Sequence, residues 1–354
     1  MRIVQIVPTF LNGDAVGNNC RAIEAILREA GYETDIYAEN IDPRLPPKAA
    51  HQIADIGKLG DRDVQLYHMA TASRMDLTSY GGNIVFQYHN ITPPLFFKGY
   101  DAAAEENCKQ GMDEVKSFKD LPVLCWAVSE FNKTDLIQAG YTCPIHTVPI
   151  LVPFEDYEQP EDKKVLEEYD DDYVNFLFVG RVVPNKAFED VILTFAWYQK
   201  HINDNCRLFL VGNTSMISYV NKLRNYIRLL DVRNVIFPGH ISFNAILSYY
   251  KLADIFLCMS RHEGFCVPLL EAMYFHVPII ARNTTAIPYT LGNSGVLVDD
   301  NDPVTAALLA DKIINNSKLR ESIVRKQDRR LEDFSHEKIK KQILDEVNML
   351  QSMF

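Results

Sequence analysis

The chain has 354 residues, a length that suffices for two domains with a hydrophobic core each. Its formal net charge of -11 argues against nucleic-acid binding as the main function, because nucleic-acid-binding proteins usually carry a basic surplus. Its seven cysteines are scattered without a C-x-x-C pair, so the sequence indicates neither a disulfide framework nor a zinc site and predicts buried thiols in a reducing compartment.

No stretch of the sequence approaches the roughly 20 apolar residues that a membrane span requires. The apolar run near the N-terminus, residues 3–7, is too short for a signal peptide. We therefore expect a cytoplasmic protein, with peripheral contact at the inner face of a membrane as an alternative.

Short apolar runs alternate with polar loops through the first half of the chain. Residues 3–7 predict a strand, a polar loop with glycines follows, and apolar residues at helical spacing between 22 and 30 predict a helix that ends at Gly31. Further strands are predicted at 64–67, 84–88 and 123–128. Strands joined by helical crossovers indicate an open α/β sheet.

An acidic, turn-prone stretch between 153 and 172 precedes a second alternation of strands and helices. Helices are predicted at 188–201 and 217–230. Strands are predicted at 175–180, 207–211, 235–237, 253–259 and 277–281. This pattern is typical of a parallel, doubly wound sheet, which binds its ligands at the carboxyl ends of the strands.

The predicted fold is therefore α/β, with two Rossmann-like doubly wound domains that face a central cleft. We place the first domain at 1–154, an acidic linker at 155–172 and the second domain at 173–334. Amphipathic helices are predicted after Pro303, and we expect the last of them, within 335–354, to pack back on the first domain.

One of these C-terminal helices is rich in basic residues. A membrane-surface patch would explain them. The acidic residues between them favour the alternative, an ordinary solvated helix face. The basic residues are Lys318, Arg320, Arg325, Lys326, Arg329 and Arg330.

The densest functional pattern follows the predicted strand 253–259. A turn at Gly264 and a proline at position 268 predict a helix start, because the first turn of a helix does not need the N–H that proline lacks. The backbone N–H groups of Phe265, Cys266 and Val267 would then point out of a helix N-terminus, where they suit a phosphate or a sugar hydroxyl.

Two glutamates flank this predicted helix start. Glu263 lies in the turn and Glu271 in the helix, so the two carboxylates reach different depths of one wall of the site. A carboxylate can accept hydrogen bonds from two adjacent hydroxyls. The pair therefore suits a ligand with a sugar at each end.

The segment EGFCVPLLEAM, with Glu263 and Glu271 in E-x7-E spacing, resembles the donor-site signature of glycosyltransferase family 4, whose members are retaining enzymes of the GT-B fold. The resemblance implies that Glu263 contacts hydroxyls of the transferred sugar and that Glu271 binds the ribose of the donor. The chain departs from the family at Cys266, where members usually carry a second glycine, so the backbone would approach the donor less freely there.

A second motif, Gly180 to Lys186, follows the first predicted strand of the second half. Arg181 offers a planar fork of donors and Lys186 a point charge, a combination that suits a diphosphate. In the family that the chain resembles, matching residues stabilise the leaving nucleoside diphosphate. A surface arginine and lysine in a loop are the alternative.

Three further positions gain a role mainly from the resemblance. The loop with Gly13 and Asp14 resembles, weakly, the family's N-terminal glycine loop near phosphate and acceptor, with a plain strand-to-helix turn as the alternative. His89 closes the predicted strand 84–88, where a family histidine lies beside the donor sugar; a structural histidine is the alternative. Base contacts in the family are largely backbone contacts near 238–241, which implies Ile241.

An acidic run raises a rival interpretation. Asp170, Asp171 and Asp172 match the D-x-D pattern by which the other major glycosyltransferase fold binds a divalent metal. The run lies before a strand in the acidic stretch, and the run 299–302 lies in a turn, so solvated loops are favoured for both. The absence of G-x-G-x-x-G argues against a nicotinamide enzyme. We expect no metal and no cofactor besides the donor substrate.

The resemblance implies metal-independent, retaining transfer of a hexose from a UDP- or GDP-linked sugar to a sugar hydroxyl of a glycan or lipid-linked acceptor, as in polysaccharide biosynthesis. The donor would lie against residues 180–300 and the acceptor against 1–150, with hinge closure excluding water. Two alternatives remain: an epimerase or phosphorylase with the same fold, and an inactive homologue acting as a scaffold, in which site residues should be lost.

Overall fold

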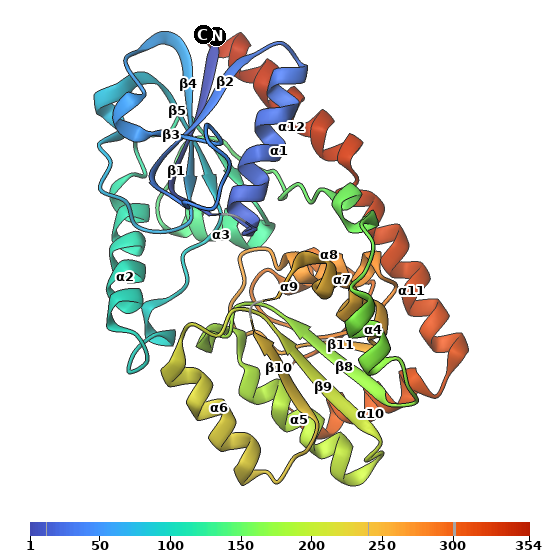
Figure 1. Cartoon of the computed structure of the whole chain (residues 1–354). Coiled ribbons are helices and arrows are strands. Elements are labelled where there is room, and N and C mark those ends of the chain that lie inside the picture. The colour runs from blue at the N-terminus through green and yellow to red at the C-terminus, as the bar shows by residue number, and fades with distance from the viewer. Residues whose placement is uncertain (12, 240, 300–301) are drawn as a thin grey trace. The chain divides into compact units, whose positions relative to one another are not determined.

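The computed structural model describes residues 1–11, 13–239, 241–299 and 302–354. Its contacts divide the chain into two units. Unit 1 comprises Met1–Leu95, Ala103–Pro153 and Phe334–Phe354, and unit 2 comprises Phe96–Ala102 and Phe154–Asp333. Each unit is built on one parallel sheet with helices around it (Figure 1), which confirms the predicted α/β class with two doubly wound sheets.

The sheet of unit 1 has seven strands in the order β3-β2-β1-β4-β5-β6-β7. The recorded strand pairings are all parallel. Four of the strands confirm predicted ones, whereas β2 was not predicted because polar residues interrupt its apolar ones. The strands are β1 (Arg2–Phe10), β2 (Glu33–Ile41), β3 (His51–Gln52), β4 (Leu59–Met69), β5 (Gly81–Tyr88), β6 (Leu124–Ala127) and β7 (Ile145–Thr147).

Helices cover both faces of this sheet. Residues of α1 (Ala15–Glu29) and α12 (His336–Met353) pack with Leu66 and Val85 on one face. Residues of α2 (Ala102–Ser117) and α3 (Glu130–Gln138) pack with the opposite face. The C-terminal helix α12 thus lies in the core of unit 1, and the two chain ends lie near each other in Figure 1.

The sheet of unit 2 has six parallel strands in the order β10-β9-β8-β11-β12-β13. The chain builds outward from β8 in one direction and then from β11 in the other, so the topological switch point lies between β8 and β11. The strands are β8 (Val174–Val179), β9 (Cys206–Val211), β10 (Val235–Gly239), β11 (Ile255–Cys258), β12 (Ile279–Arg282) and β13 (Val296–Val298).

The helices of unit 2 form two groups on opposite sides of its sheet (Figure 1). One group is α5 (Phe188–His201), α6 (Ile217–Leu229) and α10 (Pro303–Ile314). The other group is α4 (Lys163–Tyr169), α7 (Phe243–Leu252), α8 (Val267–Tyr274), α9 (Ile287–Leu291) and α11 (Ser317–Leu331). Within the described ranges, no helix has the length and apolarity to cross a membrane.

Single turns of 3₁₀ helix connect several of these elements. They are η1 (Ile53–Asp55), η2 (Leu77–Tyr80), η3 (Pro94–Phe96), η4 (Phe154–Glu158), η5 (Pro184–Lys186) and η6 (Glu332–Phe334). Of these, η4 and η5 contribute residues to the candidate site.

The acidic segment 155–172 is more than a connecting linker. It forms most of η4 and all of α4 and belongs to unit 2. Its buried Tyr157 packs against the rings of Tyr274 and Phe275, with centroids 5.5 and 6.1 Å away. Aromatic side chains bury large apolar areas, so Tyr157 anchors this segment to unit 2. The acidic composition of the segment had predicted a solvated linker instead.

The basic helix α11 carries ion pairs on its surface. Arg320 pairs with Asp254 at 3.3 Å, and Arg325 pairs with Glu321 at 3.5 Å. Opposite charges next to the basic side chains are typical of a solvated helix face. Membrane contact of this helix stays a prediction.

Candidate functional site

The two motif loops meet at the switch point of unit 2. The first loop follows β8 and contains η5, and the second follows β11 and leads into α8. Asn185 joins them: its carbonyl oxygen accepts a hydrogen bond from the N–H of Arg261 at 2.8 Å, and its side-chain amide donates to the carbonyl of His262 at 3.1 Å. The backbone of one loop therefore positions the backbone of the other.

Lys186 and Glu263 form an ion pair across this junction. The Lys186 ammonium donates to both carboxylate oxygens of Glu263 at 2.7 Å. Their side chains are only 18% and 6% exposed. Burial alone would lower the pKa of Lys186, but the charge of Glu263 and its hydrogen bonds outweigh burial, so the pKa of Lys186 is raised. Lys186 is therefore a cation in this site.

Lys186 and Arg181 have hydrogen-bond donors that could bind an anionic ligand. An ammonium has three donors, and Glu263 takes two of those on Lys186. The exposed Arg181 makes no side-chain hydrogen bond or ion pair with the residues described. A fork of donors and a point charge at the carboxyl end of β8 match the chemistry of a diphosphate.

Glu271 is held by two tyrosines that the sequence analysis missed. One carboxylate oxygen accepts from the Tyr157 hydroxyl at 2.8 Å and the other from the Tyr250 hydroxyl at 2.6 Å. Burial raises the pKa of Glu271, and the two hydroxyl hydrogen bonds oppose this rise. Each oxygen keeps a second acceptor position, so the carboxylate can still bind a pair of vicinal hydroxyls.

The start of α8 is strained at its N-cap. Cys266 adopts φ 73° and ψ 66°, a left-handed conformation that a side chain disfavours and glycine does not. Cys266 provides no side-chain cap to the described part of the helix, whose first residue is the half-buried Val267. Gly264 is half-buried and Phe265 buried in the turn before it. The Leu269 N–H already donates to the Cys266 carbonyl at 3.1 Å, and Pro268 has no N–H. Among the described residues no partner is recorded for the Val267 N–H, which can therefore bind a ligand.

Three donor atoms at the end of β11 and in the turn after it come close enough to hold a metal ion. They belong to Cys258, Glu263 and Cys266 and lie within 4.8 Å of one another, with the two sulfurs 4.0 Å apart. No metal site is predicted from the sequence here, because these cysteines do not have a zinc-motif spacing. Both oxygens of Glu263 already accept from Lys186, so a metal would have to displace the ammonium.

Two further predicted backbone positions lie beyond strands β8 and β10. Gly180 follows β8 directly and is half-buried, and a Cβ added to it would have its nearest neighbours at 4.0 Å. Packing therefore does not demand glycine there. Ile241 is half-buried beyond β10, and its neighbour at position 240 lies outside the described residues.

In unit 1, the predicted glycine loop caps a helix. Asp14 is the N-cap of α1, and its side chain accepts from the N–H of Gly17 at 2.6 Å. Gly13 precedes it at φ 78°, and Asn12 lies outside the described residues. Because a carboxylate already occupies this helix start, Asp14 has a structural role of its own.

His89 lies directly after β5 and is buried. Its Nε2 is 3.0 Å from Nδ1 of His68, a residue of β4 that the sequence analysis did not single out. Burial lowers the pKa of His89 to about 3, so its imidazole is neutral at physiological pH.

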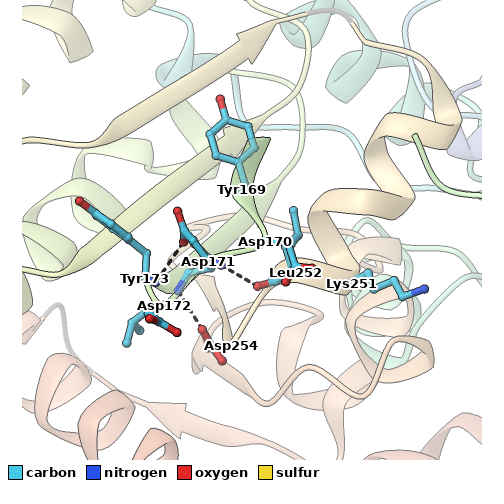
Figure 2. A pocket seen from close by; sticks show the side chains of 10 residues that line it. Tyr169, Asp170, Asp171, Asp172, Tyr173, Lys251, Leu252 and Asp254 are labelled. Carbon is cyan, nitrogen blue, oxygen red and sulfur yellow. Dashed lines mark hydrogen bonds between the residues drawn. The ribbon is translucent and has the colours of Figure 1, made fainter. Parts of the chain in front are cut away.

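The acidic run 170–172 lines a separate pocket of about 320 Å³ (Figure 2). This pocket surrounds the residues that precede β8 and β11, which places it at the amino ends of these strands. The three aspartates are exposed, as expected of a solvated loop, although Asp171 pairs with the buried Arg207. Asp299 accepts from Asn283 at 2.6 Å. The run thus lies at the opposite edge of the sheet from the two motif loops.

Comparison with known proteins agrees with this geometry. Residues 158–330 match the family described as Glycosyl transferases group 1. This part of the chain belongs to the group 1 glycosyltransferase family. The group 1 segment contains both motif loops, whereas Gly13, Asp14 and His89 lie outside it.

Two curated relatives align over about half of each chain. The capsular polysaccharide biosynthesis glycosyltransferase CapM of Staphylococcus aureus is 28% identical over 188 residues, which are 51% of this chain and 48% of CapM. The O-antigen chain mannosyltransferase B of Escherichia coli is 24% identical over 210 residues, 56% of this chain and 51% of that protein. The chain thus spans about half the length of these relatives.

Solved structures resemble the fold over the whole chain. The sucrose-phosphate synthase of Thermosynechococcus elongatus has a TM-score of 0.78 at 15% identity and is covered completely, as is this chain. Anabaena HepE in complex with UDP-glucose has a TM-score of 0.74 at 16% identity, over 99% of this chain and 100% of HepE. These structural similarities confirm that the chain has the predicted GT-B fold.

Proposed function

We propose that this protein is a glycosyltransferase that binds a nucleoside diphosphate sugar at the switch point of unit 2. The observation that carries the proposal is the ion pair between Lys186 and Glu263, which joins two loops at the carboxyl ends of β8 and β11 within the segment that matches the group 1 family. Doubly wound sheets bind their ligands at such a point.

Each site residue has a role in this proposal. Glu263 binds hydroxyls of the transferred sugar, and Glu271 binds the ribose with its two remaining acceptor positions. Arg181, the third donor of Lys186 and the Val267 N–H at the start of α8 stabilise the negative charge that develops on the departing diphosphate. Groups fixed by the fold before reaction provide this stabilisation without reorganisation, so we propose that transfer needs no metal.

The proposed reaction moves a hexose from a UDP- or GDP-linked donor to a sugar hydroxyl of a glycan or lipid-linked acceptor. The bond from the anomeric carbon to the diphosphate breaks, the acceptor oxygen bonds to the same face of that carbon, and the leaving phosphate takes the acceptor proton. The names of two relatives, a capsular polysaccharide glycosyltransferase and an O-antigen mannosyltransferase, support polysaccharide biosynthesis as the context.

A donor screen tests this proposal. UDP-, GDP- and ADP-linked hexoses are added to the purified chain in the presence of EDTA, and the melting temperature is followed. A ligand at 100 times its dissociation constant adds about 2.7 kcal/mol to the stability of the folded state, so the true donor should raise the melting temperature clearly. If none of the nucleotide sugars stabilises the protein, with or without added Mg²⁺, the donor site is wrong.

Arg181→Ala provides the next step with a matched control. Arg181 is exposed, so its loss should leave the melting temperature unchanged while transfer from the identified donor slows by about 100-fold, as for loss of one charge-stabilising group. Arg224→Ala removes an equally exposed arginine from α6 and should leave transfer at the wild-type rate. Equal rates in the two variants would exclude the diphosphate role of Arg181.

A further inference from the structure

A chain of polar side chains crosses the face of the unit 1 sheet that α1 covers. It runs from Gln5 on β1 through His68 on β4 to His89 after β5, and each of the three is buried. The same face is otherwise formed by apolar residues such as Ile3 and Leu66. Buried polar groups in such a layer need hydrogen-bond partners, so the direction of each hydrogen bond is constrained.

The first two hydrogen bonds have only one possible direction. The side-chain nitrogen of Gln5 lies 2.9 Å from the carbonyl oxygen of Cys20 in α1, and a carbonyl can only accept. The side-chain oxygen of Gln5 therefore faces His68, whose Nε2 lies 3.0 Å away. That nitrogen must carry a proton and donate it.

The next hydrogen bond follows from the neutral state of both imidazoles. Burial lowers the pKa of His68 well below its ordinary value and that of His89 to about 3. A neutral His68 with its proton on Nε2 has a lone pair on Nδ1. Nε2 of His89, 3.0 Å from this lone pair, must therefore donate to it, and Nδ1 of His89 has no proton.

This last nitrogen is buried and has no hydrogen-bond partner in the part of the chain that the structure describes. Gln87 offers a complementary group two residues earlier on the same face of the strand. Its side-chain oxygen accepts from Asn19 at 3.1 Å, while its side-chain nitrogen is also buried without a partner among the described residues. A buried acceptor and a buried donor on one face suit a hydroxyl, which both donates and accepts.

We propose that Gln5 and His68 are positioning residues that hold His89 with its proton on Nε2, so that Nδ1 is a fixed hydrogen-bond acceptor for a bound hydroxyl. That the hydroxyl belongs to a sugar substrate rests on the proposed function. An acceptor at this position repels phosphate and carboxylate oxygens and gives no proton. His89 thus selects a hydroxyl group and is no general acid.

Nuclear magnetic resonance of the full chain with ¹⁵N-labelled histidine tests the tautomer without any substrate. Long-range ¹H–¹⁵N spectra at neutral pH should show His89 with an unprotonated Nδ1 and a protonated Nε2. His89→Asn assigns the signals, and His276→Asn, which removes an exposed imidazole, should leave those of His68 and His89 unchanged. A protonated Nδ1, or rapid averaging of the two tautomers, would overturn the proposal.

Two variants test the cause of the tautomer. Gln5→Glu places a carboxylate against His68 and favours its doubly protonated form, so Nδ1 of His68 donates and the proton of His89 moves to Nδ1. His68→Leu removes Nδ1 of His68, the acceptor for Nε2 of His89, so the imidazole of His89 should average between its two tautomers. This second variant keeps the test valid if Gln5→Glu does not fold. A His89 that keeps its proton on Nε2 in every folded variant would refute the positioning role.

These readouts separate this inference from the proposed function. The tautomer is measured in the unliganded protein, whereas the donor site is tested by stabilisation with nucleotide sugars. Where transfer is measurable, His68→Leu should raise the KM for the sugar substrate, because it disorders one acceptor group. It should also lower the melting temperature, since the buried oxygen of Gln5 and Nε2 of His89 lose their partner, so the KM is measured well below that temperature.

Discussion

The ammonium of Lys186 and the carboxylate of Glu263 lie 2.7 Å apart although 77 residues separate them in the sequence. Together with the hydrogen bonds of Asn185, this ion pair joins the loops that follow the two central strands of unit 2. The same two side chains are the main candidates for contact with the diphosphate and the transferred sugar, so fold and ligand compete for their hydrogen bonds.

Removal of either partner should cost stability, because the other charge stays in a largely buried site. Lys186→Met leaves the nearly buried Glu263 unpaired and should destabilise unit 2 by about 3 kcal/mol, or about 6–12 °C in melting temperature. Glu263→Gln leaves a more exposed cation and should cost less. Thermal unfolding of both variants measures these effects.

The double variant Lys186→Met/Glu263→Gln separates stability from function. With both charges removed, the melting temperature should recover most of the loss, since neither charge remains buried alone. Transfer should stay abolished in all three variants. A double variant with the summed loss of the two single variants would show that the pair is not coupled, and measurable wild-type transfer would remove both residues from the site.

Glu271 predicts a pH dependence of stability. Its pKa in the folded protein is raised above the ordinary value of 4.5 by burial, so folding disfavours the ionised form. Below pH 4.5 the buried carboxyl therefore does not lower the free energy of unfolding. As the pH rises through the raised pKa, ionisation of the buried group progressively lowers it. Glu271→Gln removes the penalty, so the stability gain of the variant should grow from pH 4 to pH 7 in denaturant titrations.

The same variant should lose affinity for the donor. The amide of glutamine can still accept from one tyrosine and donate to the oxygen of the other, but it has fewer acceptor positions left for ribose hydroxyls. Loss of a charge-assisted hydrogen bond of about 1.5 kcal/mol corresponds to about tenfold weaker binding. Tyr250→Phe is the comparison: it keeps the carboxylate but removes a hydrogen bond that opposes the rise in its pKa, so the stability of this variant relative to the wild type should fall as the pH increases. A constant stability difference between Glu271→Gln and wild type would contradict the raised pKa.

Cys266 should distinguish backbone strain from side-chain chemistry. Its left-handed φ of 73° is costly for any side chain and most costly for a β-branched one. Cys266→Gly should therefore keep the melting temperature within about 3 °C of wild type, because relief of strain offsets the lost burial of the thiol. Cys266→Val, which is larger and β-branched, should destabilise by about 2 kcal/mol or more. Equal melting temperatures would show that the turn relaxes.

The fold was largely predictable because apolar runs mark the central strands. The strands β1, β8 and β9 are buried along most of their length and carry apolar runs, and in β4 the same holds from Val64 onward. Strand β2 was missed because its sequence, ETDIYAENI, mixes acidic and polar residues with few apolar ones. Such strands acquire their partners from the rest of the sheet, which a local pattern does not show.

The site was predictable only where its residues share a motif. Lys186 and Glu263 were identified separately, and their contact needed the positions of two strands. Tyr157 lies 114 residues from Glu271, within an acidic stretch, so no local pattern could link the two. His68 was equally hidden, since only the pairing of β4 with β5 brings it next to His89.

Gly180 and Gly212 provide the last prediction, because they differ in what surrounds them. A Cβ on Gly212, at φ 154°, would lie 1.9 Å from the carbonyl oxygen of Gly180, so Gly212→Ala should destabilise unit 2 by about 3 kcal/mol or prevent folding. A Cβ on Gly180 would meet nothing closer than 4.0 Å, so Gly180→Ala should melt within about 2 °C of wild type.

The two glycine variants should differ in donor binding as well. The methyl group of Gly180→Ala occupies space at the carboxyl end of β8, beside the cations that we assign to the diphosphate. It should therefore weaken donor binding by about tenfold at unchanged stability, which a titration of the nucleotide sugar against the folded variant measures. Wild-type affinity in Gly180→Ala would place the phosphates away from this strand end and favour the Val267 N–H at the start of α8 as their main contact.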